Sequence, residues 1–307
     1  MSDSKEKSNP EQEYPDHRQG LVRMILSCSH VVPLGWRIRI FRFLSLAYYH
    51  LSARRRLTAL LNLKNAFPEK TMEEIIPIAK GVYRNMAITA AEFFDIPWLT
   101  KERILEKIEV EGIENCAEAL AKQQGLLMVT AHFGNWELMA SAFALLFKPL
   151  VVLYRPMDNR LLDRLVLAVR SSTGNRPLRK QKAMRPMLRA LKANGIVGLL
   201  IDQNWAWQEG VFVDFFGRPA CTSDGLARLA MHMRTPVLPA FMIRLADGRY
   251  RLVIGRTVEL VDTGDEERDI VLNTQNYTRI IEDMIRKYPD HWFWVHQRWK
   301  IQPYLME

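Results

Sequence analysis

The sequence has few cysteines and no recognisable leader. Its three cysteines, Cys28, Cys116 and Cys221, lie far apart and form no CxxC pair. We therefore expect reduced thiols in a cytoplasm-facing protein, with neither a disulfide framework nor a zinc site. No secretory signal is recognisable either: residues 1–20 are polar and mixed in charge, which is typical of a flexible tail.

A continuous apolar run long enough to cross a membrane is also missing. A transmembrane helix needs roughly 20 apolar residues in succession, and the most apolar region, 21–53, is interrupted by four arginines: Arg23, Arg37, Arg39 and Arg42. Such a segment suits the membrane interface, because its arginines can reach headgroups while Leu, Ile, Phe and Trp face the acyl chains. We therefore expect a helical, membrane-associating region at residues 21–110.

Signatures of two other protein classes are absent. The 43 Lys and Arg exceed the 34 Asp and Glu, giving a formal net charge of +9. This surplus points to an anionic partner: nucleic acid, acidic lipid headgroups or an acidic carrier protein. The basic residues are dispersed and no RRM, helix-turn-helix or finger pattern occurs, so nucleic acid is not expected. The lack of G-x-S-x-G argues against a serine hydrolase.

The second part of the chain alternates short apolar runs with amphipathic segments. Strands are expected at 126–131, 150–154, 196–201 and 237–243, with helices between them. This alternation predicts an α/β domain at residues 111–303, with a mostly parallel central sheet surrounded by helices. In the helical region, a capping box at Thr71 and Glu74 predicts a helix that continues to about Phe94.

One junction between a strand and a helix carries a chemical motif, VTAHFGNWELMA. His132 directly follows the strand, and Glu137 lies five positions later, in the first turn of the next helix. The helix dipole favours an ionised Glu137 there, and that carboxylate could accept a hydrogen bond from His132. The free ring nitrogen could then take a proton from a substrate hydroxyl. Spacing alone favours a core histidine and a surface glutamate, but the strand–turn–helix context reverses this preference and favours the catalytic interpretation.

Five segments together give a resemblance. AHFGNWE, YRPMDN, IDQN, VDFFGRPACTSDGLARLA and WFWVHQRWK resemble, in this order, the late lipid A acyltransferases, which are lauroyl and myristoyl transferases. That family lies within the lysophospholipid/glycerolipid acyltransferase superfamily, and the resemblance covers residues 20–300. It implies an acyl carrier protein as donor, a saccharolipid acceptor, and a place at the cytoplasmic face of the inner membrane. It also implies that His132 and Glu137 are the catalytic pair. No cofactor or metal is expected.

The resemblance suggests further site residues. Arg155 follows the second strand and Arg170 lies on the next helix, so either could bind acceptor phosphate or the oxyanion. Asp202 and Gln203 end a later strand; Asp202 could be structural, but the family pattern assigns it to the site. Acceptors such as a lysophospholipid, an ornithine lipid or a phosphatidylinositol mannoside remain alternatives. Aromatic residues at 205–216 could line an acyl channel or simply pack, and the tryptophans at 292–299 could form an interfacial belt.

Overall fold

The first part of the chain is helical. The computed structural model describes residues 20–301, so the predicted tail lies outside the described residues except for Gly20. The helices are α1 (Gly20–Val31), α2 (Leu34–Leu51), α3 (Ala53–Ala66), α4 (Met72–Phe93) and α5 (Lys101–Lys107), with a 3-10 turn, η1 (Ile96–Trp98), before α5. The capping box that begins α4 is confirmed: Thr71 N–H donates to Glu74, and Glu74 N–H donates to the Thr71 hydroxyl.

The second part of the chain forms a seven-stranded sheet in the order β1-β9-β8-β2-β5-β3-β4. Neighbouring strands are parallel except β8 and β9, which are antiparallel. The strands are β1 (Ile108–Glu111), β2 (Leu126–Thr130), β3 (Leu150–Tyr154), β4 (Arg176–Arg179), β5 (Ile196–Leu200), β8 (Val237–Arg244) and β9 (Tyr250–Ile254). The predicted α/β fold with a mostly parallel sheet is therefore confirmed.

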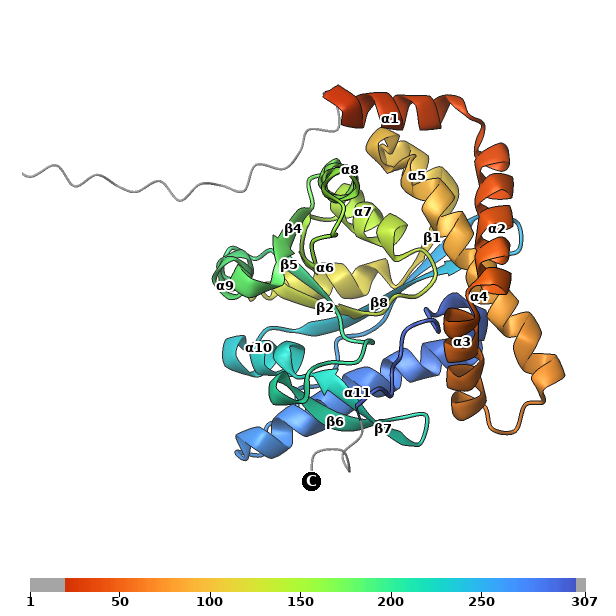
Figure 1. The fold of residues 1–307 in the computed structure, drawn as a ribbon. Coiled ribbons are helices and arrows are strands. Elements are labelled where there is room, and N and C mark those ends of the chain that lie inside the picture. Colours follow the sequence, from red (N-terminus) through yellow and green to blue (C-terminus); the bar gives the residue numbers. More distant parts are fainter. Residues whose placement is uncertain (1–19, 302–307) are drawn as a thin grey trace, which may run out of the picture.

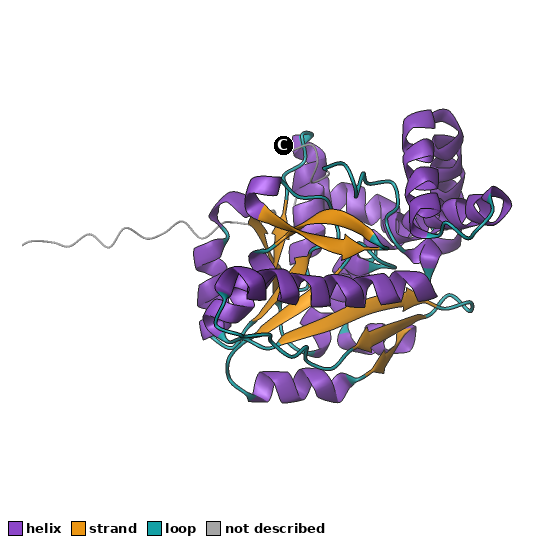
Figure 2. Cartoon of the chain, turned by 90° about the horizontal axis from the view of Figure 1, so that it is seen from below, coloured by secondary structure: helices purple, strands orange, loops and turns teal. Residues whose placement is uncertain are grey.

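Helices cover both faces of this sheet. Figure 1 shows α7 and α8 above it and α10 and α11 below it, and in Figure 2 helices surround the strands. The remaining elements are α6 (Ile113–Ala121), α7 (Trp136–Leu146), α8 (Arg160–Ser171), η2 (Lys180–Lys182), α9 (Met184–Lys192), η3 (Trp207–Glu209), the hairpin β6 (Gly210–Phe215) and β7 (Arg218–Ser223), α10 (Gly225–Met233), α11 (Glu266–Lys287) and η4 (Pro289–His291). Alternate side chains of β2, β3 and β8 enter two separate apolar cores, so that Leu127 packs in one and Met128 in the other.

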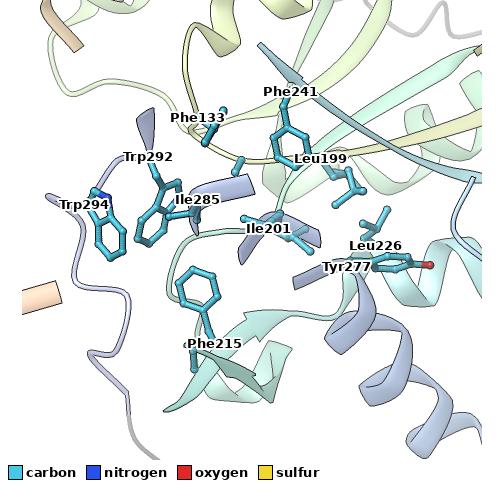
Figure 3. Close-up of a cluster of buried hydrophobic side chains, with 14 of the residues drawn as sticks. Phe133, Leu199, Ile201, Phe215, Leu226, Phe241, Tyr277, Ile285, Trp292 and Trp294 are labelled. Carbon is cyan, nitrogen blue, oxygen red and sulfur yellow. The ribbon is translucent and has the colours of Figure 1, made fainter. Parts of the chain in front are cut away.

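The tryptophans after α11 lie in the core. Trp292 and Trp294 are almost fully buried; Trp292 contacts Phe215 and Trp294 contacts Phe216 of the β6–β7 hairpin. Figure 3 shows Trp292, Trp294 and Phe215 in this buried cluster. An interfacial belt needs aromatic side chains at the molecular surface. The possible interfacial belt is therefore excluded for Trp292 and Trp294, because their indoles lie in the core beneath the hairpin.

The helices α1 to α3 leave many large apolar side chains exposed. On α2 these include Trp36, Phe43, Leu44 and Leu51, of which Phe43 is 72% and Leu51 85% exposed. Arg39 and Arg42 are exposed on the same helix. Arg37 differs from the expectation for this region: it is buried and donates to both oxygens of Asp95. Among residues 20–301, no helix combines the length and the hydropathy that a membrane span requires.

Candidate active site

Two adjacent strands bring His132 and Asp202 together. Strands β2 and β5 pair in parallel, with Thr130 opposite Leu200. His132 and Asp202 each follow two residues later, so both leave the sheet at the same carboxyl edge. This edge is where parallel α/β sheets place their ligand sites.

His132 is held by the carboxylate of Asp202. The His132 ring atom Nδ1 lies 3.0 Å from Asp202 Oδ1, and its backbone N–H donates to Asp202 Oδ2 over 3.0 Å. Trp292 Nε1 donates to the same Oδ2 over 2.8 Å. Burial alone would raise the pKa of Asp202, but the charge and hydrogen bonds of His132, together with Trp292, lower it below its ordinary value. The carboxylate is thus ionised at neutral pH and acts only as an acceptor.

This arrangement selects one tautomer of His132. Because an ionised carboxylate accepts but cannot donate, the proton of the neutral imidazole belongs on Nδ1. The other nitrogen, Nε2, keeps its lone pair and makes no hydrogen bond within residues 20–301. The side chain is 26% exposed, whereas that of Asp202 is 1% exposed. The structure thus offers a free, positioned proton acceptor backed by a buried carboxylate.

Glu137 has a different partner from the expected one. It lies in the first turn of α7, as predicted, but Arg170 of α8 binds both of its oxygens. Arg170 Nη2 donates to Oε1 over 2.5 Å and Nε donates to Oε2 over 3.0 Å. Burial opposes the charge on Arg170, yet the Glu137 carboxylate outweighs this effect and raises the arginine pKa. The carboxylate that His132 contacts is therefore that of Asp202. The predicted pairing of His132 with Glu137 is replaced by a His132–Asp202 hydrogen bond and a separate Arg170–Glu137 ion pair.

Buried hydrogen bonds hold the turn between His132 and Glu137. Asn135 caps α7 by accepting from Leu138 N–H, and its amide donates to Glu92 of α4 over 2.8 Å. Tyr250 of β9 donates to the same carboxylate. Burial raises the pKa of Glu92 despite these two hydrogen bonds. Since fully bonded buried polar networks are rigid, the turn between His132 and Glu137 is held in one conformation.

A cavity of about 600 Å³ opens beside His132. Its polar end includes His132, Glu137, Arg155, Arg170 and Lys180. Its other end, between the sheet and α7, is mostly apolar and is lined by Met128, Val152, Gly198 and Met139; Thr130, Ser141 and Asn175 also line the cavity. Met128, Gly198 and Val152 occupy one row across β2, β5 and β3.

Gly198 keeps the apolar end of the cavity open. A Cβ at this position would lie 3.1 Å from Met128 Cε and 3.3 Å from Leu150 Cδ2. Glycine in a strand interior is unfavourable and often marks the close approach of another group. Met128 lies four residues before His132 on β2, which is about 13 Å along an extended strand. The cavity therefore suits a long, narrow apolar group whose reactive end lies at His132.

The other residues expected at the site lie around its mouth. Arg155 is exposed and lines the cavity, as does Gln203, whose Nε2 lies 3.4 Å from His132 Nδ1. Of the aromatic residues at 205–216, Trp205 lines the cavity, whereas Phe215 and Phe216 belong to the core. Among residues 20–301, no group of His, Cys, Asp or Glu side chains could hold a metal ion.

Two residues at the site were not identified from the sequence. Trp292 donates to Asp202, and His296 lines the cavity and accepts from Asn204 N–H over 3.0 Å. Burial lowers the pKa of His296 to about 4, so the ring is neutral. Both residues lie in the segment WFWVHQRWK, one of those that carry the family resemblance, and this was the signal available for them.

The sequence is similar to known enzymes over most of its length. Residues 9–301 match the family described as bacterial lipid A biosynthesis acyltransferase. The lipid A biosynthesis palmitoleoyltransferase of Escherichia coli (strain K12) is 27% identical over 252 residues, which cover 81% of this chain and 80% of that protein. The lauroyltransferase of the same organism is 27% identical over 243 residues, 79% and 78% of the two chains. Its myristoyltransferase is 23% identical over 260 residues, 82% and 79%.

Proposed function

The chain belongs to the bacterial lipid A biosynthesis acyltransferases, and we propose that it moves a fatty acyl chain from an acyl carrier protein thioester to a hydroxyl of a lipid A precursor. Membership of this family makes it an acyltransferase of lipid A biosynthesis. One observation carries the finer proposal: the free Nε2 of His132 lies where a polar mouth meets an apolar cavity.

His132 acts as the general base in this proposal. Its Nε2 takes the proton of the acceptor hydroxyl while the hydroxyl oxygen attacks the thioester carbonyl. The tetrahedral intermediate then collapses, the carbon–sulfur bond breaks, and the carrier thiolate takes the proton from the imidazolium. Asp202 stabilises the transient positive charge on His132, because its buried carboxylate lies 3.0 Å from Nδ1. The products are an ester and a free thiol.

Glu137 contributes through Arg170. The paired contacts from Nε and Nη2 fix the guanidinium plane at the cavity wall, where Arg155 also lies. Guanidinium groups bind phosphate and oxyanions well, because their N–H donors form a fixed fork. Arg170 and Arg155 therefore bind the anionic substrate or the developing oxyanion, and Glu137 sets the orientation of Arg170.

The apolar cavity holds the acyl chain. Its volume is within the range of about 300–1,000 Å³ that is usual for small-molecule sites. The row formed by Met128, Gly198 and Val152 offers no hydrogen-bonding side chain, which suits an alkyl chain and not a sugar. The same geometry would serve other lipid acceptors, such as a lysophospholipid, an ornithine lipid or a phosphatidylinositol mannoside, because only the acyl group enters it.

We further propose that α1 and α2 attach the enzyme to the cytoplasmic face of the inner membrane. Trp36, Phe43 and Leu51 are exposed, and Arg39 and Arg42 lie among them. Amphipathic helices with this composition bind at the headgroup boundary by burying apolar side chains and contacting anionic lipids. A lipid acceptor in the same membrane would then reach the site by lateral diffusion.

The test is acyl transfer by a His132→Ala variant. Loss of the general base should lower turnover about 10²–10⁴-fold while the fold is kept. The assay measures transfer from acyl carrier protein thioesters to lipid A precursors and, in parallel, to lysophospholipids. A folded His132→Ala enzyme with near-normal turnover would contradict the mechanism. No acyl-enzyme should be trapped in the absence of acceptor, because the hydroxyl attacks the thioester directly.

A further inference from the structure

One segment beside the cavity carries charge of a single sign. The 17 residues from Arg176 to Lys192 contain no Asp or Glu, although the chain as a whole has 34 of them. Six basic residues of this segment are exposed and define what we call the basic face: Arg176, Arg179, Lys180, Arg185, Arg189 and Lys192. They come from β4, η2 and α9.

Helix α9 presents half of the basic face as one stripe. Arg185, Arg189 and Lys192 are spaced by four and three residues, so they lie on the same side of the helix. Met187 and Leu191 on the other side are buried in the core of the sheet. The orientation of α9 is thus fixed by packing, which leaves the basic stripe facing solvent.

The basic face begins at the mouth of the cavity. Lys180 and Gln181 line the cavity, and α9 starts three residues later. Helix α9 leads into the amino end of β5, whose carboxyl end carries Asp202, so Arg185 at the start of α9 lies nearer the cavity than Lys192 at its end. The span from Arg185 to Lys192 is about 10 Å along a helix.

Most of the six side chains of the basic face form no salt bridge within the described residues. Lys180 pairs with Glu209, and Arg179 donates to the Tyr154 hydroxyl. Within residues 20–301, Arg176 and the three residues of the α9 stripe form no salt bridge. An aligned row of unpaired cations repels itself, and it favours the approach of an anionic partner.

The composition of the basic face fits an acidic protein better than a membrane. Membrane-binding surfaces combine basic residues with large exposed apolar side chains. Here the large exposed apolar side chains lie mainly on α1 to α3, and Met184 is the one at the start of α9. In Figure 1, α9 lies on the left of the molecule and α2 and α3 lie on the right. The two surfaces thus differ in chemistry and lie on different sides.

We propose that the basic face docks the acidic carrier protein that delivers the acyl thioester. This inference rests on the proposed function, since it assumes that the donor is a protein-bound thioester. The acidic surface of the carrier contacts the stripe on α9 and Lys180, and the thioester reaches the mouth of the cavity beside them. Complementary charge steers such an encounter and fixes its orientation.

The test compares two double variants of the full-length enzyme. Arg185→Glu with Arg189→Glu reverses the stripe, and Arg256→Glu with Arg279→Glu makes the same change at exposed arginines outside the basic face. Binding of the fluorescently labelled carrier protein is measured by anisotropy, and kcat/KM is measured with its acyl thioester. We expect the stripe variant to lose about 10-fold or more in both quantities. The control variant should stay within about twofold of wild type.

Salt dependence and vesicle binding complete the experiment. The loss of carrier binding and of kcat/KM in the stripe variant should become smaller as salt is raised, because the Debye length falls from about 10 Å at 0.1 M to about 3 Å at 1 M. Carrier binding and transfer equal to wild type in the folded stripe variant would overturn the docking surface but leave the proposed donor intact. If the wild type neither binds the carrier protein nor uses its thioester, the proposed function itself fails. Loss of binding to phosphatidylglycerol vesicles, with carrier binding unchanged, would assign the basic face to the membrane.

Discussion

Asp202→Asn tests whether the buried carboxylate controls the tautomer of His132. Two N–H groups, the backbone of His132 and Nε1 of Trp292, donate to Asp202 Oδ2 over 3.0 and 2.8 Å. In the variant these donors require an oxygen, so the amide oxygen takes that place and the NH2 takes the place of Oδ1. The NH2 would then donate to His132 Nδ1 and move the imidazole proton to Nε2.

The expected effect on turnover is large. With its proton on Nε2, His132 cannot accept one from the substrate hydroxyl at that position, so catalysis should fall about 10²–10⁴-fold. KM should change little, because the Asp202 side chain is 1% exposed and lies behind the histidine. The fold should persist, since two of the hydrogen bonds to this position are kept.

The matched control is Glu137→Gln. This change weakens the two contacts from Arg170 and leaves those of His132 in place, so it should mainly alter substrate binding. Nitrogen-15 chemical shifts of the imidazole report the tautomer in each variant. Turnover within about threefold of wild type in Asp202→Asn, with loss of turnover in Glu137→Gln, would refute this reasoning and return the orienting role to Glu137.

Three further predictions concern the cavity, the pH response and the membrane. Gly198→Ala should lower kcat/KM more for long acyl donors than for short ones, because the added methyl group narrows the apolar end of the cavity. The control Gly225→Ala lies outside the cavity and should change kcat/KM by the same factor for every acyl length. Burial lowers the pKa of His296 from 6.5 to about 4, so between these pH values the histidine is protonated in the unfolded state and neutral in the folded state. The free energy of unfolding should therefore fall as pH drops from 6.5 to 4. Denaturant titrations of His296→Gln should show a weaker dependence of this free energy on pH. Phe43→Ser with Leu51→Ser should weaken recovery with anionic vesicles without changing the melting temperature; an unchanged recovery would contradict attachment by α2.

Local patterns predicted the elements but not their neighbours. Apolar runs and capping residues gave the alternation of strands and helices, because these signals act over a few residues. The order of strands is set by long-range packing, which no such pattern encodes. His132 and Asp202 lie 70 positions apart, and they meet because β2 pairs with β5 in a register that places Thr130 opposite Leu200. The strand–turn–helix context therefore favoured Glu137 as the partner of His132, although Asp202 supplies the carboxylate that His132 contacts.

The cavity lies between the two surfaces that the proposals assign to the substrates. At one end Lys180 belongs to the basic face. On another side, Ile96 of η1 lines the cavity and belongs to the same buried cluster as Val22 and Leu26 of α1, one of the helices that carry exposed apolar side chains. A carrier-bound thioester and a membrane-bound hydroxyl could thus approach from different sides and be present together. Direct transfer requires such a ternary complex, whereas an acyl-enzyme route would let one entrance serve both substrates in turn. The separation of the two surfaces therefore favours the direct route.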